Sequence, residues 1–287
     1  SSLVMTMEDE KLHNKDIYVM YADFKGAFNA ADHRIMFKHM RQLGMPPTFV
    51  DTCEHLYGVS TTDYITPHGP TPSIDINRGT LQGDTLSPFL FTLFLEPFLR
   101  WLTVGSRGYR PGPPATNVDP TEPTATYPGH GFADDLSLVT GSTRNMTIER
   151  RNLSLFSVYT GMTVNIRKCC ITGALWLTCN ALTLANTTLL ASRLQTQFIT
   201  LNSTPAPIPS IGPTDTYRVL GVELNTSLTF TKHWHELKRT TASLITSLST
   251  SPLTQFRRIR VIRGLLIRKH FTLQLGLFTD SQLETLE

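Results

Sequence analysis

Three aspartates occupy positions that are costly unless a positive charge lies nearby. Asp23 comes at the end of an apolar run that begins at Ile17, and Asp134 and Asp135 stand side by side between apolar segments. A carboxylate in apolar surroundings, or two adjacent carboxylates, destabilises a fold without compensation. Each placement also has an ordinary explanation, because Asp23 could cap a following helix and an Asp-Asp pair often initiates a turn.

Taken together, the three carboxylates predict a divalent metal site. If 17–24 is a strand and 132–139 a hairpin of the same sheet, Asp23 and Asp134 can meet at one sheet edge. Two ions held roughly 3.5–4 Å apart activate an attacking oxygen and stabilise the leaving oxygens of a phosphoryl transfer. Oxygen-only ligands favour Mg²⁺, with Mn²⁺ as an alternative. We therefore expect the two carboxylates within about 8 Å of each other, the span of such a cluster.

The pattern around these residues predicts a mixed α+β fold. Apolar periodicity indicates helices over about 35–43, 87–102 and 146–160, with Ser87 as N-cap, and strands over 162–168 and 217–224. The order strand, helix, hairpin, helix, strand is that of a ferredoxin-like βαββαβ unit, an antiparallel sheet with helices on one face. A Pro- and Gly-rich stretch over 105–130 predicts a loop.

Five segments resemble the motifs of reverse transcriptases and follow one another in the order of that family. They are Tyr21–Phe28, Arg78–Pro88, Phe132–Asp135, Gly161–Lys168 and Tyr217–Gly221. The similarity is closest to retrotransposons that lack long terminal repeats, the LINE type. The resemblance implies a right-hand polymerase palm with partial fingers and the start of a helical thumb.

The resemblance assigns a role to individual residues. It implies Asp23, Asp134 and Asp135 as catalytic metal ligands for two Mg²⁺ ions, and Lys168 as a catalytic group near the pyrophosphate. An ordinary exposed lysine is the alternative interpretation of Lys168. Arg78 either steadies its loop or contacts phosphate, and a plain surface arginine is the alternative. The other implied contacts are Phe24, Phe28, Arg78, Gln82 and Gly83 for the incoming nucleotide, and Tyr217, Leu220 and Gly221 for the primer grip.

Phe28 lies five positions after Asp23, where the family places an aromatic residue under the sugar. A ring at that position leaves no room for a 2′-hydroxyl, so the resemblance implies a preference for deoxynucleotides. RNA-dependent RNA polymerases tend to have an aspartate there. A core phenylalanine at the start of a helix is the alternative interpretation.

The chain also departs from the family pattern. Asn29 stands where relatives usually have aspartate, and only 22 residues precede Asp23, so the upstream basic strands of the fingers are not present. We expect residues 1–229 to form the palm with partial fingers and 230–287 to begin a basic helical thumb. A segment of this extent should polymerise poorly by itself, because the triphosphate needs those cations for alignment.

Composition places the chain among ordinary globular proteins, since 40% of its residues are hydrophobic and 17% are charged. The net charge is only +3, but residues 230–287 hold nine Lys/Arg against four Asp/Glu. Six of these basic residues lie within 257–269, which indicates either a solvated helix face or a surface along a phosphate backbone.

The four cysteines show no zinc-ligand spacing and are interpreted as reduced thiols. With no signal peptide and no membrane segment, we expect an intracellular protein of the nucleus or cytoplasm that is not secreted. The sequence does not specify the oligomeric state.

The favoured function is reverse transcription, with an RNA template, a DNA primer and dNTPs as partners. Two alternatives stay open at this point. An RNA-dependent RNA polymerase is disfavoured by Phe28 and by Ala133 in place of a glycine. A non-catalytic nucleic-acid-binding scaffold derived from a polymerase is disfavoured by the presence of all three carboxylates.

Overall fold

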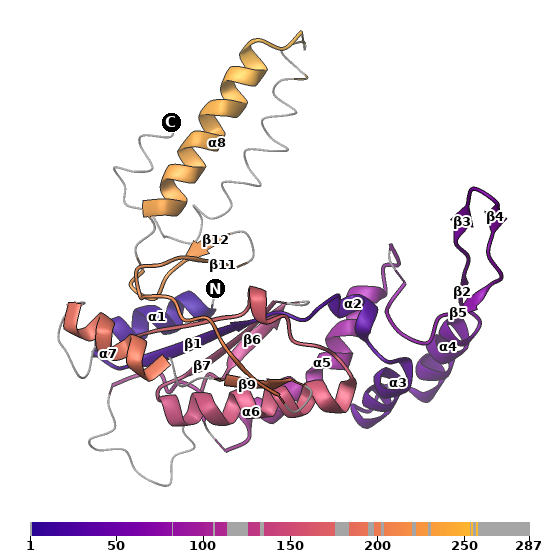
Figure 1. Cartoon of the computed structure of the whole chain (residues 1–287), viewed down its shortest axis with the longest axis horizontal. Coiled ribbons are helices and arrows are strands. Elements are labelled where there is room, and N and C mark those ends of the chain that lie inside the picture. Colours follow the sequence, from indigo (N-terminus) through magenta and orange to yellow (C-terminus); the bar gives the residue numbers. More distant parts are fainter. Residues whose placement is uncertain are drawn as a thin grey trace. The chain divides into compact units, whose positions relative to one another are not determined.

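Figure 1 presents the computed structural model of the chain. It describes residues 2–81, 83–105, 107–113, 126–132, 135–175, 184–194, 198–201, 204–219, 222–228 and 231–252, together with 254 and 257. The chain divides into two compact units, Asp9–Gly212, and Ser1–Glu8 together with Pro213–Glu287. The assignment of 1–229 to a palm with fingers and of 230–287 to a thumb stays a prediction.

A four-stranded antiparallel sheet forms the centre of the unit Asp9–Gly212. Its strands are β1 (Ile17–Ala22), β6 (Gly129–Phe132), β7 (Asp135–Thr140) and β8 (Cys170–Ala174), in the order β6-β7-β1-β8. Every residue of β1 is buried, as its unbroken apolar run requires of a strand covered on both faces. The predicted mixed α+β class is confirmed, and the helix-separated strand order is the one expected from the sequence.

Three helices supply most of the core that packs on one face of this sheet. They are α3 (His33–Gln42), α5 (Ser87–Thr103) and α6 (Thr143–Thr160), and their apolar side chains join those of Tyr18, Met20 and Ala22 in one buried cluster. In Figure 1, α6 runs along the sheet beside the strands. No helix within the described residues has the length and apolar character needed to cross a bilayer.

Local sequence explains where these helices begin and end. The Asp32 carboxylate accepts hydrogen bonds from the backbone N–H groups of Arg34 and Ile35, and so caps α3. The Ser142 hydroxyl caps α6 in the same way, and Gly161 ends α6 at φ 70°, in the left-handed region that glycine adopts without strain. Helix α3 therefore starts close behind Asp23, and α6 stops just before the segment that returns to it.

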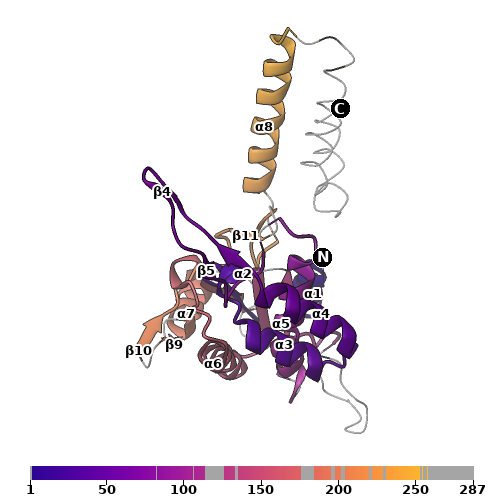
Figure 2. The same cartoon turned by 90° about the vertical axis from the view of Figure 1, so that its right-hand side faces the viewer.

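The remaining elements of this unit lie outside the central sheet and its three main helices. They are the end of α1 (Ser2–His13), α2 (Ala27–Ala30), α4 (Pro47–Gly58), β2 (Thr61–Thr62), β3 (Ile65–Thr66), β4 (Gly69–Pro70), β5 (Ile74–Asp75), the 3-10 helix η1 (Ile166–Lys168), α7 (Leu184–Leu194), β9 (Phe198–Leu201) and β10 (Thr204–Pro207). The β3–β4 hairpin projects away from α4 in both views (Figures 1 and 2). Its Ile65 side chain is almost fully exposed.

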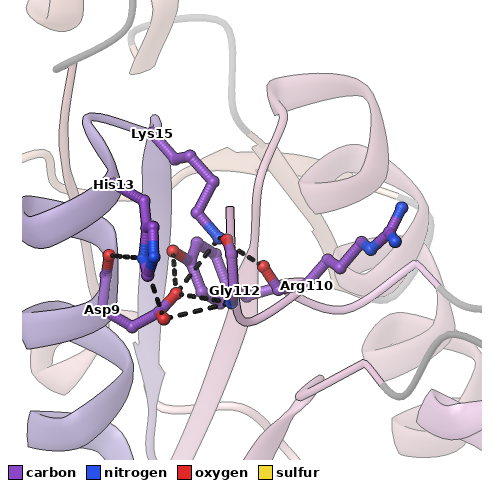
Figure 3. Close-up of polar contacts among 6 residues, drawn as sticks. Asp9, His13, Lys15, Arg110 and Gly112 are labelled. Carbon is purple, nitrogen blue, oxygen red and sulfur yellow. Dashed lines mark hydrogen bonds and ion pairs between the residues drawn. The ribbon is translucent and has the colours of Figure 1, made fainter. Parts of the chain in front are cut away.

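A polar cluster fixes the end of α1 (Figure 3). The Asp9 carboxylate accepts hydrogen bonds from the Tyr109 hydroxyl at 2.9 Å and from the Gly112 N–H at 3.1 Å. His13 and Lys15 lie 3.1 Å from the same carboxylate, and Lys15 also donates to the carbonyl of Gly112. The cluster ties α1 to a chain segment about a hundred residues further on.

The second unit contains β11 (Tyr217–Val219), β12 (Val222–Leu224) and α8 (Thr231–Ser249). The sequence predicted one strand over 217–224, whereas β11 and β12 pair as an antiparallel hairpin. Trp234, on α8, is buried. The basic residues from 258 onward lie outside the described residues.

Three further predictions about local structure were wrong. Residues 162–168 form a loop and η1, and the returning strand is β8, from Cys170. The N-cap of α5 is Leu86, since the Ser87 hydroxyl donates to the carbonyl of Leu81 instead. Strand β6 begins inside the predicted loop 105–130, because only a glycine at 129 fits against the carbonyl oxygen of Ser137.

Candidate active site

Asp23 follows directly on β1 and is 6% exposed. Its main chain is held by the loop after α6, because Asn165 N–H donates to the carbonyl of Asp23 at 2.8 Å. Lys25 N–H donates to the carbonyl of Thr163 at 2.8 Å, with Phe24 and Val164 bridged between these two bonds. The backbone on both sides of the carboxylate is therefore fixed.

Within the described residues, the contacts of the Asp23 side chain are made by one of its two carboxylate oxygens. Oδ2 accepts from Asn165 Nδ2 at 3.0 Å, and Lys168 Nζ lies 3.5 Å from the same oxygen. Among the described residues, none contacts Oδ1. A buried carboxylate oriented by an amide and a cation, with one oxygen left over, fits a divalent ion as its remaining partner.

Strand register relates Asp135, the described aspartate of the pair, to Asp23. Ala22 pairs with Leu136, so one further step along the ladder sets Asp135 opposite Asp23. Phe132 pairs with Asp135, which leaves only Ala133 and Asp134 between β6 and β7. Residues directly opposite each other in a sheet have Cβ atoms about 4.5–5.5 Å apart. This register agrees with the predicted convergence of the carboxylates.

Asp134 itself lies outside the described residues, so its separation from Asp23 stays a prediction. Asp135 is the first residue of β7 and is exposed. No group of three His, Cys, Asp or Glu side chains gathers within the described part of the chain, which does not include Asp134.

A thiol lies behind the Asp23 carboxylate. Cys169 is buried, and burial, together with the charge of Asp23, raises the pKa of its thiol to about 11. The thiol is therefore neutral near pH 7, and a neutral thiol is a poor metal ligand. The described carboxylates at this end of the sheet, Asp23 and Asp135, offer oxygen donors, which suit Mg²⁺.

Lys168 is one of the predicted site residues that the structure brings to Asp23. Its side chain is 66% exposed, and its ammonium group is the one already placed 3.5 Å from Asp23 Oδ2. The contact comes from η1, which turns the chain just before β8. A cation in this position can reach solvent and an anionic ligand without leaving the carboxylate.

The two phenylalanines of the first motif differ in exposure. Phe24 is 2% exposed and belongs to the core. A substrate could therefore contact the main chain of Phe24 but not its side chain. Phe28 is half-buried and stacks on Phe91 of α5, with ring centroids 4.6 Å apart and planes 28° apart. The stacking gives Phe28 a firm support while leaving part of the ring uncovered.

The loop before α5 is anchored at its start. Arg78 lies 3.7 Å from the buried carboxylate of Asp32 and remains half exposed. Its guanidinium also lies next to Gly161, at the end of α6, where a cation is stabilised by the helix dipole. Gly83 adopts φ 88° with nothing close to its Cα, so the conformation and not crowding requires glycine. Gln82 lies outside the described residues.

Asp32 is a charged anchor for this loop. Burial on its own raises the pKa of Asp32, but hydrogen bonds from the Arg34 side chain and the Ile35 N–H outweigh burial and hold that pKa below its usual value. The carboxylate therefore stays ionised at neutral pH and keeps its attraction for Arg78.

The predicted primer-grip residues lie in the other unit. Tyr217 begins β11 and is half-buried, whereas Leu220 and Gly221 lie outside the described residues. Their assignment stays a prediction.

Sequence reasoning missed two residues near the site. Asn165 hydrogen-bonds to the Asp23 carboxylate, and the one available signal was its position three residues before Lys168 in a motif already singled out. His33 donates a hydrogen bond to the carbonyl of Gly79 across 46 positions of sequence, and no local pattern indicates that contact.

Comparison with known proteins identifies the class of protein that carries this site. Residues 2–224 match the family described as reverse transcriptase (RNA-dependent DNA polymerase). The match covers well over half of the chain, and the chain belongs to this family.

The chain is distantly similar to Pol polyproteins of R2 retrotransposable elements. It is 27% identical over 161 residues to the one from the type-2 element R2DM of Drosophila melanogaster, covering 56% of this chain and 14% of that protein. It is 26% identical over 159 residues to one from a type-1 element R2 of Popillia japonica, covering 55% and 25%. The chain thus spans a quarter or less of these relatives.

Among solved structures, telomerase from Candida albicans, in complex with the TWJ fragment of telomeric RNA, is similar at a TM-score of 0.48 and 12% identity. That match covers 100% of this chain and 46% of the telomerase chain.

Proposed function

We propose that this chain is the right-hand palm of a reverse transcriptase and catalyses template-directed DNA synthesis from dNTPs. The observation that carries the proposal is the Asp23 carboxylate, which is buried, oriented by Asn165 and Lys168, and has Oδ1 uncontacted by any described residue. The strand register supports this, because the β1–β7 ladder ends at the pair Ala22–Leu136, next to Asp23 and Asp135. Membership of the reverse transcriptase family supports the same activity.

Asp23, Asp134 and Asp135 would hold two Mg²⁺ ions, with Mn²⁺ as an alternative. Bound there, the ions supply Lewis-acid stabilisation of the attacking and leaving oxygens. The primer 3′-oxygen forms a bond to the α-phosphorus of the dNTP as the bond to pyrophosphate breaks. Lys168 can neutralise the pyrophosphate and donate a proton to it, and Asn165 keeps the Asp23 carboxylate in its orientation.

The incoming nucleotide would lie between two segments. Phe28, supported from behind by Phe91, forms the floor under the sugar and rejects a 2′-hydroxyl by overlap. Gln82 and Gly83 contact the nucleotide from the other side, and Arg78 steadies their loop through Asp32. Tyr217, Leu220 and Gly221 would hold the primer end.

The natural template would be RNA and the primer DNA, in an element that inserts its product into a genome. Support comes from the relatives, which are Pol polyproteins of retrotransposable elements. The basic segment 257–269 suits contact with a phosphate backbone.

The proposal is tested by primer extension on an RNA template with the full natural protein. Asp23→Asn and Asp134→Asn should each lower Mg²⁺-dependent extension by roughly a thousandfold or more, because each removes several kcal/mol of transition-state stabilisation. Asp9→Asn is the matched control, since Asp9 is a carboxylate that already has its partners. Retained activity in Asp23→Asn or Asp134→Asn would refute the assignment.

A second experiment separates this function from RNA synthesis. Phe28→Val should raise the efficiency of ribonucleotide incorporation relative to deoxynucleotides while lowering deoxynucleotide incorporation comparatively little. The quantity to measure is the ratio of kcat/KM for the two sugars, because specificity is a ratio of efficiencies. An unchanged ratio would make Phe28 a core residue and would favour the RNA polymerase alternative.

A further inference from the structure

Two segments that carry opposite sides of the proposed nucleotide pocket lie against each other along their length. The first is 28–33, which begins at Phe28, and the second is 77–81, which leads into Gln82 and Gly83. Thr80 N–H donates to the carbonyl of Phe28 at 2.8 Å, and Gly79 N–H donates to the carbonyl of Ala31 at 2.8 Å. The pocket walls are therefore joined through main-chain hydrogen bonds.

The approach is close enough to require a glycine. Gly79 has φ 88°, and a Cβ at this position would lie 3.0 Å from the Cα of Asn29 and 3.1 Å from its carbonyl oxygen. A Cβ here would push the Asn29 main chain away by a few tenths of an ångström, and the positive φ would strain any other residue. The distance between them is therefore fixed by contact and not only by hydrogen bonds.

His33 holds the same glycine from the other side. The side chain is buried at 8% exposure, and its Nε2 lies 2.7 Å from the carbonyl oxygen of Gly79. A carbonyl only accepts, so Nε2 carries the hydrogen and donates. The imidazole and the Tyr57 ring of α4 are nearly perpendicular, with their centroids 5.0 Å apart. The Tyr57 hydroxyl accepts a hydrogen bond from Leu81 N–H at 3.4 Å. Two helices thus hold successive parts of the loop.

We propose that His33 is a positioning residue for nucleotide binding, acting through the carbonyl of Gly79. It fixes Gly79, and with it the start of the loop that leads to Gly83, relative to the segment from Asp23 to Phe28. It thereby sets the width of the proposed nucleotide pocket between this loop and the Phe28 ring. The inference rests on the proposed function, because it takes these two segments as the walls of a dNTP site. His33 touches no reacting atom.

The chain contains a matched control on the same helix. His39, also on α3, is buried at 2% exposure and has its Nδ1 2.9 Å from the carbonyl oxygen of Phe94 in α5. Replacing either histidine with phenylalanine keeps a ring and removes one buried donor to a backbone carbonyl. Only the change at His33 affects the loop 78–83.

The first readout is hydrogen exchange, which needs no activity. In His33→Phe, the amides of Gly79 and Thr80 should exchange at least about tenfold faster, because one hydrogen bond holding the loop has been lost. The amides of β1 should be unchanged, and His39→Phe should leave Gly79 and Thr80 as in the wild type. Unchanged exchange at Gly79 and Thr80 in His33→Phe would overturn the proposal.

The second readout is steady-state primer extension with the full natural protein. His33→Phe should raise the KM for dNTPs roughly threefold to tenfold, the equivalent of one hydrogen bond, with a smaller change in kcat. His33→Gln, whose amide can donate from about the position of Nε2, should restore most of the wild-type exchange rate and KM. The same variant replaces His33→Phe in both measurements if the phenylalanine variant does not fold. Faster exchange without any change in KM would overturn the positioning role. A wild type inactive in extension would refute the proposed function, while exchange would still decide whether His33 holds the loop.

Discussion

Two carboxylates, the half-buried Asp9 and the buried Asp23, differ in how many described groups contact their oxygens. Asp9 is the more exposed, with 22% of its side chain accessible, yet its two oxygens contact Tyr109, Gly112, His13 and Lys15 (Figure 3). Asp23 has 8% of its side chain accessible, and both of its side-chain contacts with described residues are made by Oδ2. Among the described residues, the less exposed carboxylate therefore has fewer partners.

This difference separates a structural carboxylate from one that is prepared for a ligand. Because burial disfavours a charge that is not compensated, a fold that only needed stability would saturate Asp23 as it saturates Asp9. The pKa shift of Asp9 also indicates a carboxylate that is stabilised by its partners. Burial raises the pKa of Asp9, but hydrogen bonds from Gly112, Lys15 and Tyr109 outweigh it and hold the pKa below its usual value. The pKa of the Tyr109 hydroxyl is raised by burial and by its bond to Asp9.

Removing the Asn165 amide, which orients the Asp23 carboxylate, should have the largest effect on Mg²⁺ dependence. Asn165→Ala should raise the Mg²⁺ concentration needed for half-maximal extension by roughly 10- to 100-fold, the usual cost of losing a contact that orients a metal ligand. Activity at saturating Mg²⁺ should recover most of its value. Asn152 is the control, because its amide also donates to a buried carboxylate, that of Glu149 at 2.9 Å. A Mg²⁺ titration in which Asn165→Ala matches Asn152→Ala would contradict this role.

Removing the charge of Asp9 should affect folding and leave the chemistry intact. Asp9→Asn leaves the Lys15 ammonium without its carboxylate and weakens the bonds from Tyr109 and Gly112, at a cost of about 1–3 kcal/mol in the free energy of unfolding. Urea unfolding measures this loss. The Mg²⁺ dependence of extension should be that of the wild type, and a shift in it would link the two regions that the comparison separates.

The same carboxylate predicts a smaller effect of pH. The pKa of Asp9 is lower in the folded chain than the ordinary value of 3.8, so its contribution is fully present above that value and is lost as the pH falls through the folded pKa. The difference in unfolding free energy between wild type and Asp9→Asn should be constant from pH 7 to about pH 5 and shrink below about pH 4. A difference that grows in acid would reverse the sign of the inferred shift.

Most of the central fold could be predicted from sequence, because local patterns specify it. The apolar run of β1, the periodic apolar faces of α3, α5 and α6, and Gly161 at the end of α6 each act over a few residues. The segment 162–168 could not be predicted. Its alternating Met162, Val164 and Ile166 is typical of a strand, but tertiary hydrogen bonds between Asn165 and Asp23 turn the chain there.

The candidate site divides in the same way. The positions of Asp23 and Lys168 followed from motifs, and the structure brings these two side chains together. The hydrogen bonds from His33 to Gly79 and from Tyr109 to Asp9 join residues far apart in sequence. No local sequence pattern indicates which distant group a hydrogen-bond donor will contact. Whether a carboxylate is satisfied can be judged only from the folded chain.

The most direct test of the account is the binding of a divalent ion. Mn²⁺ titrations, followed by the electron paramagnetic resonance of the free ion, compare the wild type with Asp23→Asn and Asp9→Asn in the presence of primer–template and a non-incorporable dNTP analogue. Asp23→Asn should bind Mn²⁺ more than about tenfold more weakly, because losing a residue that only orients a metal ligand already lowers metal affinity by about tenfold or more. Asp9→Asn should bind Mn²⁺ as the wild type does. Equal Mn²⁺ affinity in Asp23→Asn and the wild type would contradict the claim that the unsaturated carboxylate is the metal ligand.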